Sequence, residues 1–259
     1  MTAMFAASDL PAAPGRTALF LDIDGTLLDI APLPDAVAVP ATLIETLRRL
    51  HAALDGAVAF VSGRMLEEID RLFVPLRFDA AAEHGAVLRL GGVEQDQPEV
   101  DAAVLAIREA AEDFVARRPG LMFEAKRHCF AVHYRLCPER QHEIRRFLAA
   151  AIAPFEGRFE LLAGKMVWEV RPRGVSKGAA IARMLEHAPY RGRHPVFAGD
   201  DRTDEDGFAF VTRAGGTGLR VGNGPPGSTE RVLASPGALR AWLAAMAGIA
   251  EGVDVRAAG

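Results

Sequence analysis

Two aspartates separated by a single residue carry the strongest chemical signal in this sequence. Asp22 and Asp24 are followed by Gly25 and Thr26, directly after a short apolar run. In an extended segment, side chains two residues apart point the same way, and a glycine allows the chain to turn sharply. Two neighbouring carboxylates repel each other, so a bound divalent cation would compensate them, and oxygen ligands suit Mg²⁺. The pair Asp-Gly is also common in turns, and the motif alone leaves that structural role open.

A repeating pattern of apolar segments must position these residues. Three short apolar runs read as fully buried strands, at residues 17–21, 57–61 and 195–198. Each run closes on a polar cluster, which begins with Asp22, Ser62 or Gly199-Asp200. Segments 43–54 and 178–187 show apolar residues at helical spacing. Buried strands alternating with helices indicate a parallel α/β sheet, in which ligands bind beyond the carboxyl ends of the strands.

The middle of the chain has a different pattern. Its expected elements are a helix, two strands, a second helix and two further strands, at residues 100–118, 121–126, 129–135, 138–153, 158–162 and 165–171. Alternating strands of this kind predict an antiparallel sheet backed by helices. We therefore expect a loose leader at residues 1–16, a core domain at 17–98 and 174–259, and an inserted α+β cap domain at 99–173.

The polar clusters, in their order along the chain, resemble the hallmarks of the haloacid dehalogenase superfamily of phosphotransferases. The family pattern has Asp-x-Asp-Gly-Thr after the first strand, a Ser or Thr after the second, a Lys before a later helix and an acidic pair after a further strand. Asp22-Ile-Asp24-Gly25-Thr26, Ser62, Lys177 and Gly199-Asp200-Asp201 occupy these places. The resemblance implies a Rossmann-like parallel sheet core with an αββαββ cap of the C2B type.

Simple chemistry assigns roles that agree with this resemblance. Asp22 is ionised at neutral pH and can attack phosphorus directly, while Asp24 can protonate the leaving oxygen and then deprotonate a water molecule. Ser62 and Lys177 would bind phosphoryl oxygens, and the first turn of the helix after Lys177 would add backbone donors.

The same acidic residues predict a metal site. Asp22 and Asp200 are the expected Mg²⁺ ligands, with Asp24 binding through its backbone carbonyl as the resemblance implies and Asp204 in support. Asp201, like Glu205 and Asp206, could equally cap the following helix.

The last strand of the cap indicates what the leaving group is. In Gly164-Lys165-Met-Val-Trp168-Glu169-Val-Arg171-Pro172, an alternation of period two places Lys165, Glu169 and Arg171 on one face and apolar residues on the other. A face that both donates and accepts hydrogen bonds suits sugar hydroxyls, although an exposed strand with self-neutralising ion pairs would read the same way.

This stretch is also similar to the trehalose-6-phosphate phosphatase family, as are Glu83-His84-Gly85 and His133-Tyr134-Arg135. The similarity implies Mg²⁺-dependent hydrolysis of trehalose 6-phosphate, with Lys165 and Glu169 binding the distal sugar and Arg171 a further candidate. Arg64 and His84 receive no role.

Composition narrows the remaining choices. With 30 Lys+Arg against 34 Asp+Glu, the formal net charge is −4, which argues against a nucleic-acid partner. No apolar run is long enough for a membrane span, two cysteines are too few for a disulfide framework, and the first charged residue is Asp9 rather than a basic one. These features favour a cytoplasmic, monomeric protein that binds a small sugar phosphate.

Two alternatives stay open: a phosphatase for another sugar phosphate such as sucrose 6-phosphate, and a non-catalytic sugar-phosphate-binding regulatory module. A module without activity is expected to lack one of the catalytic residues. Asp22, Asp24, Lys177 and Asp200 are all present, and the enzyme is favoured.

Overall fold

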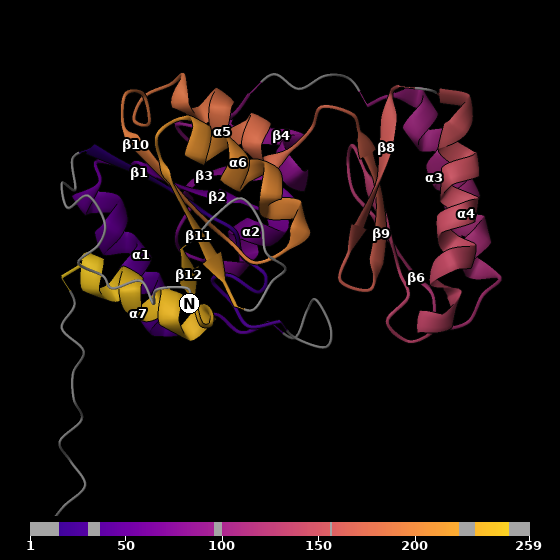
Figure 1. The fold of residues 1–259 in the computed structure, drawn as a ribbon, viewed down its shortest axis with the longest axis horizontal. Helices are drawn as coiled ribbons and strands as arrows, with labels where there is room; N and C mark the ends of the chain where they lie inside the picture. Colours follow the sequence, from indigo (N-terminus) through magenta and orange to yellow (C-terminus); the bar gives the residue numbers. More distant parts are fainter. Residues whose placement is uncertain (1–15, 31–36, 96–99, 156, 223–230, 249–259) are drawn as a thin grey trace, which may run out of the picture.

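The chain folds around two separate β-sheets (Figure 1). The structure, a computed structural model, describes residues 16–30, 37–95, 100–155, 157–222 and 231–248. All but the last residue of the expected leader, and the expected boundary between residues 98 and 99, lie outside these ranges. None of the helices in the described ranges is both long and apolar enough to cross a membrane.

The larger sheet has eight strands in the order β12-β11-β10-β1-β2-β3-β4-β5. Their bounds are β1 Thr17–Leu21, β2 Val58–Val61, β3 Asp79–Ala82, β4 Val87–Leu90, β5 Val93–Glu94, β10 His194–Gly199, β11 Thr217–Val221 and β12 Val232–Leu233. The strands from β12 to β3 are parallel, and β4 and β5 extend the sheet in antiparallel fashion. The three predicted buried strands are thus confirmed as β1, β2 and β10, three neighbours at the centre of the sheet.

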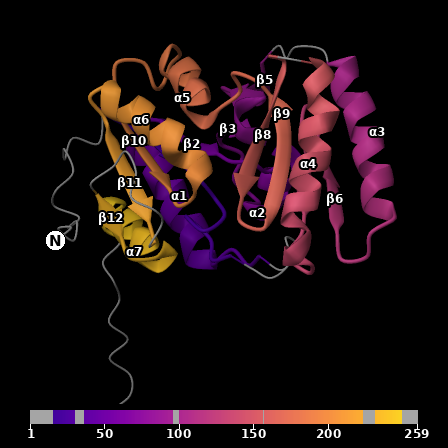
Figure 2. The same cartoon turned by 45° about the vertical axis from the view of Figure 1, so that its right-hand side comes forward.

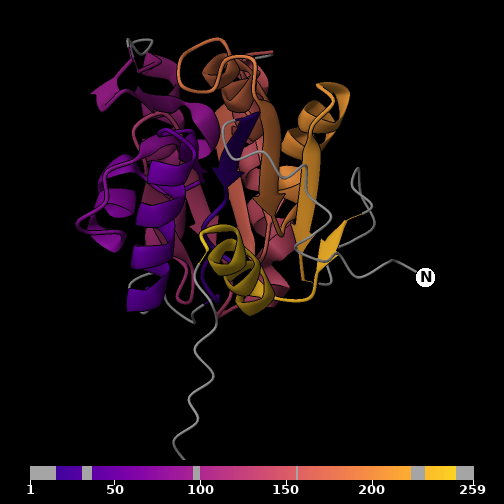
Figure 3. The same cartoon turned by 90° about the vertical axis from the view of Figure 1, so that its left-hand side faces the viewer.

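Helices cover both faces of this sheet. They are α1 Ala41–Ala53, α2 Leu66–Leu72, α5 Lys177–Leu185, α6 Glu205–Arg213 and α7 Pro236–Met246. Figures 1 and 3 show α1 beside α7 on one face and α5 beside α6 on the other. In α1, the apolar side chains of Leu43, Leu47 and Leu50 recur at helical spacing and are buried against the sheet. The two helices predicted for this part of the chain, at 43–54 and 178–187, are confirmed as α1 and α5 within two residues at each end.

The smaller sheet has four antiparallel strands in the order β6-β7-β9-β8, and two helices cover one of its faces (Figure 2). The elements follow one another as α3 Ala102–Ala116, β6 Met122–Ala125, β7 Phe130–His133, α4 Gln141–Ile152, β8 Phe159–Gly164 and β9 Val167–Pro172. The predicted order αββαββ is therefore confirmed. Trp168 and Val170 of β9 pack with Ile107 of α3 and Ile144 of α4 in a hydrophobic core of their own, which confirms the predicted apolar face of that strand.

The start of β9 differs from the prediction. Gly164 pairs with Val167, so Lys165 and Met166 form the two-residue turn of a β-hairpin, and Met166 adopts a left-handed backbone conformation with φ 61°. Lys165 therefore lies at the tip of the hairpin and not on the sheet face that Glu169 and Arg171 share. Alternation alone missed the turn because it assumes that the strand continues through every matching residue.

Candidate functional site

A buried ammonium group bridges two aspartates at the carboxyl edge of the larger sheet. Asp22 directly follows β1, Asp204 ends a short 3₁₀ turn after β10, and Lys177 is the first residue of α5. The Lys177 Nζ atom lies 2.7 Å from Asp22 Oδ1 and 2.6 Å from Asp204 Oδ1. All three residues are buried. Tertiary folding thus brings together side chains that are up to 182 positions apart in the sequence.

Asp200 completes the acidic cluster from the end of β10. The Thr26 hydroxyl donates a hydrogen bond to Asp22 Oδ2 at 2.9 Å and lies 3.3 Å from Asp200 Oδ1. Carboxylate oxygens of Asp22, Asp200 and Asp204 lie within 4.8 Å of one another, and all three side chains are buried. Asp204 also accepts hydrogen bonds from the backbone N–H groups of Asp200 and Asp201, which holds the loop after β10 in place.

The residues present fit a divalent metal ion. Burial raises the pKa of Asp22 to about 8, and the negative charges of Asp204 and Asp200 add to this effect against the opposing charge of Lys177. A cation at this point would remove that cost. Gly25, with φ 80°, lets the Asp200 carboxylate lie against the turn, because a Cβ atom at residue 25 would be 2.2 Å from Asp200 Oδ2. Three buried carboxylates held this close together are the oxygen-rich, hard donor set that binds a metal ion.

Asp24 has different hydrogen-bond partners from Asp22. Hydrogen bonds from Gly25 N to Leu28 O and from Leu28 N to Ile23 O form a turn directly after Asp22. The side chain of Asp24 instead accepts two hydrogen bonds from Arg64, at 2.6 and 2.7 Å, in a bidentate ion pair.

The predicted phosphate-binding groups are partly occupied by neighbouring protein groups. Ser62 is buried directly after β2, and its hydroxyl oxygen accepts a hydrogen bond from the backbone N–H of Arg64 at 3.2 Å. At the start of α5, the N–H of Gly178 donates to Asp206 and the N–H of Ala179 donates to the Ser176 hydroxyl. The expectation that the first turn of α5 offers free donors is therefore wrong for these two amides.

Glu169 joins the smaller sheet to the larger one. Its Oε2 atom lies 2.7 Å from His84 Nε2, and its Oε1 atom accepts a hydrogen bond from Lys126 Nζ at 2.8 Å. Burial alone would raise the pKa of Glu169, but the charges of His84 and Lys126 hold it well below the usual value. The imidazole fits here because residue 63 is a glycine: a Cβ at Gly63 would lie 2.5 Å from His84 Nε2.

A second contact between the sheets involves Glu83, which directly follows β3 in a left-handed conformation with φ 48°. Its carboxylate accepts hydrogen bonds from the backbone N–H groups of Arg127 and His128, at 3.1 and 2.8 Å, in the turn between β6 and β7. The thiol of Cys129 lies 3.4 Å from the same carboxylate. The smaller sheet therefore meets the residues after β3 in two places, through Glu169 of β9 and through the backbone of the turn between β6 and β7.

The other two predicted sugar-binding residues lie on different parts of the β8–β9 hairpin. Lys165, at its tip, donates a hydrogen bond to Asp200 Oδ2 and thereby reaches the acidic cluster. Arg171, near the end of β9, pairs with Glu160 of β8 at 2.7 Å. The buried atoms His84 Nδ1 and Arg171 Nη1 have no hydrogen-bond partner among the described residues. Polar atoms of this kind mark places where a ligand or water molecule could bind.

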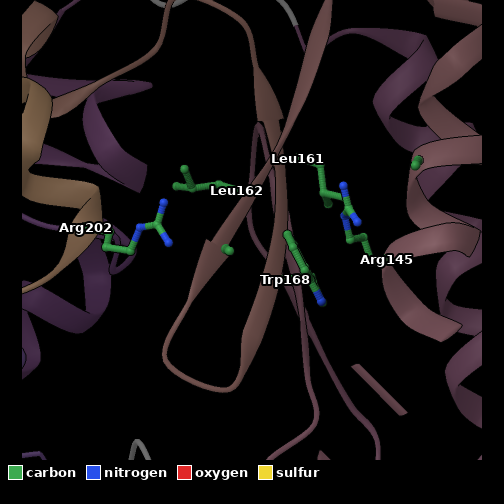
Figure 4. A pocket seen from close by; sticks show the side chains of 7 residues that line it. Arg145, Leu161, Leu162, Trp168 and Arg202 are labelled. Atoms are coloured by element: carbon green, nitrogen blue, oxygen red, sulfur yellow. The ribbon is translucent and has the colours of Figure 1, made fainter. Parts of the chain in front are cut away.

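A pocket of about 460 Å³ lies at the outer edge of the smaller sheet, around β8 (Figure 4). Figure 4 shows Leu162 and Arg202 on one side of the strand, and Leu161, Trp168 and Arg145 toward α4 on the other. None of the clustered aspartates lines it. This pocket is therefore separate from the acidic site, although Arg202 belongs to the loop that follows Asp200.

Sequence reasoning gave no role to several residues that the structure places at or beside the site, chiefly Arg64, His84, Glu83 and Lys126. A usable signal existed for the first three, since each follows the carboxyl end of β2 or β3 within three residues. Lys126, at the end of β6, carried no such signal. The alternative capping role is the observed one for Asp201, which accepts a hydrogen bond from Arg202 N at the start of the 3₁₀ turn. Asp206 also accepts a hydrogen bond from a backbone N–H, but from that of Gly178 in α5 and not from one in the helix that follows Asp201.

Comparison with known proteins agrees with this architecture. Residues 20–231 match the model of the Trehalose-phosphatase family. The chain is 40% identical over 237 residues to the trehalose-6-phosphate phosphatase of Escherichia coli (strain K12), covering 91% of this chain and 88% of that one. It is 42% identical over 235 residues to a probable trehalose-phosphate phosphatase of Sinorhizobium fredii (strain NBRC 101917 / NGR234), covering 89% and 87%.

Solved structures show the same fold. A crystal structure described as a trehalose-6-phosphate phosphatase related protein superimposes with a TM-score of 0.75 and 27% identity, covering 89% of this chain and 97% of that one. Together with the family match over most of the length and the assembled acidic cluster, this likeness shows that the chain belongs to the trehalose-phosphatase family of the haloacid dehalogenase superfamily.

Proposed function

We propose that the protein hydrolyses trehalose 6-phosphate to trehalose and phosphate with Mg²⁺ as its cofactor. The observation that carries this proposal is the buried cluster of Asp22, Lys177, Asp200 and Asp204 at the carboxyl edge of the larger sheet, in a chain of the trehalose-phosphatase family. The assignment of Mg²⁺ rests on the three carboxylates, because hard oxygen ligands suit that ion.

In the first step, Asp22 attacks the phosphorus atom and the bond between phosphorus and the sugar oxygen breaks. Asp24 donates a proton to that oxygen as it leaves, and an aspartyl-phosphate forms on Asp22. Lys177, in contact with Asp22, is placed to bind a phosphoryl oxygen, and the hydroxyl of Ser62 would donate to another. A bound dication would supply positive charge that keeps Asp22 ionised and offsets the charge of the phosphate.

In the second step, a water molecule attacks the phosphorus of the aspartyl-phosphate. Asp24, now ionised, accepts the proton of that water, phosphate leaves and the Asp22 carboxylate is restored. Arg64 acts here as a positioning residue, because its two hydrogen bonds hold the Asp24 carboxylate in one orientation. The bidentate pair suits the ionised form of Asp24, which is the form that acts as the base in this second step.

Recognition of the sugar is proposed for the polar face of the smaller sheet and for the hairpin tip. Glu169 and Arg171 lie on that face and are buried, and Lys165 extends from the tip toward Asp200. The unpartnered atoms His84 Nδ1 and Arg171 Nη1 support this placement, since sugar hydroxyls both donate and accept hydrogen bonds. We also propose that the expected cap domain, residues 99–173, opens for substrate and closes to exclude water.

The two alternatives make different use of the same site. Another sugar phosphate, such as sucrose 6-phosphate, would meet the same carboxylates but different partners on the smaller sheet. A non-catalytic binding module would have no need for Asp22 in contact with Lys177 and for Asp24 held by Arg64. The presence of both arrangements in one site favours the enzyme.

The test is release of phosphate from trehalose 6-phosphate, sucrose 6-phosphate and glucose 6-phosphate, each with Mg²⁺ and with a chelator. We expect trehalose 6-phosphate to be the best substrate and the chelator to abolish turnover. Asp22→Asn should lower the rate by at least about a thousandfold, because an amide is a poor nucleophile. Asp55→Asn, an equal substitution on the surface, should leave it unchanged. Equal rates for all three substrates would contradict the assignment of trehalose 6-phosphate.

A further inference from the structure

The tip of the β8–β9 hairpin places a positive charge on one of the three carboxylates expected to bind the metal ion. Lys165 donates its hydrogen bond to Asp200 Oδ2, and Asp200 belongs to the cluster with Asp22 and Asp204. Lys165 comes from the smaller sheet, whereas the cluster belongs to the larger one. The contact therefore crosses between the two sheets and ends inside the metal site.

Every carboxylate of the cluster has an ammonium partner in this arrangement. Lys177 contacts Asp22 and Asp204, and Lys165 contacts Asp200. The two ammonium groups differ in their surroundings: the side chain of Lys177 is 2% exposed, and that of Lys165 is 49% exposed. A half-exposed lysine on a flexible four-carbon stem can leave its partner at little cost, whereas a buried one cannot.

A dication held by the cluster would lie beside the same carboxylate that Lys165 contacts. Oδ2 of Asp200 lies against Gly25, and the missing Cβ is what lets the carboxylate approach the turn so closely. Thr26 lies 3.3 Å from the other oxygen, Oδ1. A cation and an ammonium group at Asp200 Oδ2 would lie within a few ångströms of each other and would repel. Each of them therefore weakens the binding of the other at this carboxylate.

We propose that Lys165 and the divalent cation compete for Asp200, so that binding of the cation frees the Lys165 ammonium group for the substrate. The inference rests on the proposed metal-dependent function. Without the cation, Lys165 occupies the cluster and holds the hairpin tip against the larger sheet. With the cation, the ammonium group of Lys165 is released at the place where an anionic sugar phosphate enters. Metal binding and substrate binding are then linked through one side chain.

The first experiment measures the affinity for Mg²⁺ by calorimetry, in the absence of substrate, for the wild type and two variants. Lys165→Met removes the competing charge and keeps the length of the side chain. Arg202→Gln is the matched control, because it removes a positive charge from the exposed loop that follows Asp200. We expect Lys165→Met to bind Mg²⁺ about two- to fivefold more tightly, the range that corresponds to losing one partly exposed ion pair. Arg202→Gln should change the affinity by less than half as much.

The second experiment follows the Lys165 amine itself. An amine-selective reagent is applied at limiting concentration with and without saturating Mg²⁺, and modification is quantified by mass spectrometry of the peptides. Labelling of Lys165 should rise when Mg²⁺ is present, because the amine loses its carboxylate partner. Lys126 is the internal control, since it is paired with Glu169 away from the cluster, and its labelling should not change.

The outcomes separate this inference from the function on which it rests. Lys165 labelling that is unaffected by Mg²⁺, or a Lys165→Met affinity no higher than that of Arg202→Gln, would overturn the competition even in a fully active Mg²⁺-dependent phosphatase. If the wild type neither binds Mg²⁺ nor needs it to release phosphate, the proposed function fails first and the inference fails with it.

Discussion

Replacing Gly25 by alanine should damage the metal site far more than the fold. Gly25 has a φ of 80°, in the left-handed region that costs an L-residue about 1–2 kcal/mol. The added Cβ would lie 2.2 Å from Asp200 Oδ2 and 2.6 Å from its carboxylate carbon. Real Cβ contacts stay above 3.0 Å, so the Asp200 carboxylate, or the turn that carries residue 25, must move by roughly an ångström.

A second glycine separates these two effects. Gly192 has a φ of 74°, and a Cβ added there would meet no atom within 4 Å. Gly192→Ala therefore carries the same backbone strain without a clash. Both variants should lose about 1–2 kcal/mol of unfolding free energy in urea. Only Gly25→Ala should also lose about a hundredfold in phosphate release from trehalose 6-phosphate, because displacement of a site group by about 1 Å can cost that much.

The assay pairs urea unfolding with a Mg²⁺ titration of phosphate release for both variants. The Gly25→Ala variant should need more Mg²⁺ for half-maximal activity, whereas Gly192→Ala should resemble the wild type. If Gly25→Ala keeps a rate within about threefold of Gly192→Ala, the claim that Asp200 needs the space beside residue 25 is refuted.

Three further substitutions test single contacts. Lys177→Met leaves two buried carboxylates without their ammonium partner, so the metal-free protein should lose about 3–5 kcal/mol of unfolding free energy in urea. Saturating Mg²⁺ should recover much of this loss. An unfolding free energy equal to that of the wild type would contradict the burial of the Lys177 ammonium group. The pKa of Glu169 is held below its usual value of 4.5 by cations that include His84. The contribution of Glu169 to stability should therefore be present above that pH and be lost as the pH falls further. Urea unfolding of the wild type and Glu169→Gln from pH 3 to 6 would show this as a difference in unfolding free energy that becomes smaller at low pH. Arg64→Met should lower kcat by about tenfold or more with a smaller change in KM, since Asp24 loses its orientation but the sugar contacts remain; a loss confined to KM would place Arg64 in substrate binding instead.

Strands could be predicted from the local sequence where a segment is apolar throughout. β1 was predicted with its observed bounds because all five residues of Thr17–Leu21 lie in one buried run. β3 escaped notice because Asp79–Ala82 contains three alanines, which have low strand propensity and show no alternation. Its burial comes from neighbours on both faces of the sheet, and no local signal reports those neighbours.

The catalytic candidates were predictable for a related reason. Asp22, Ser62 and Asp200 each follow a buried strand, and the carboxyl ends of parallel strands share one edge of the sheet. That these strand ends lie side by side depends on strand order, because β10 and β2 flank β1, with Leu21 paired to Ala198 on one side and to Phe60 on the other. The order is a property of the sheet and has no counterpart in the spacing of the residues along the chain.

The sequence by itself determined the central strands β1, β2 and β10, the helices α1 and α5, the order of elements in the smaller sheet and its helices, and the residue types at the strand ends, because these depend on neighbours a few positions away. Only the tertiary structure decided which charges meet. It paired Asp24 with Arg64, Glu169 with His84, and Lys165 with Asp200. Each pair joins residues at least 35 positions apart, and such contacts form only when separate elements pack. Lys165 differs most from its prediction, since a two-residue turn moves it from a sheet face to the tip that reaches the acidic cluster.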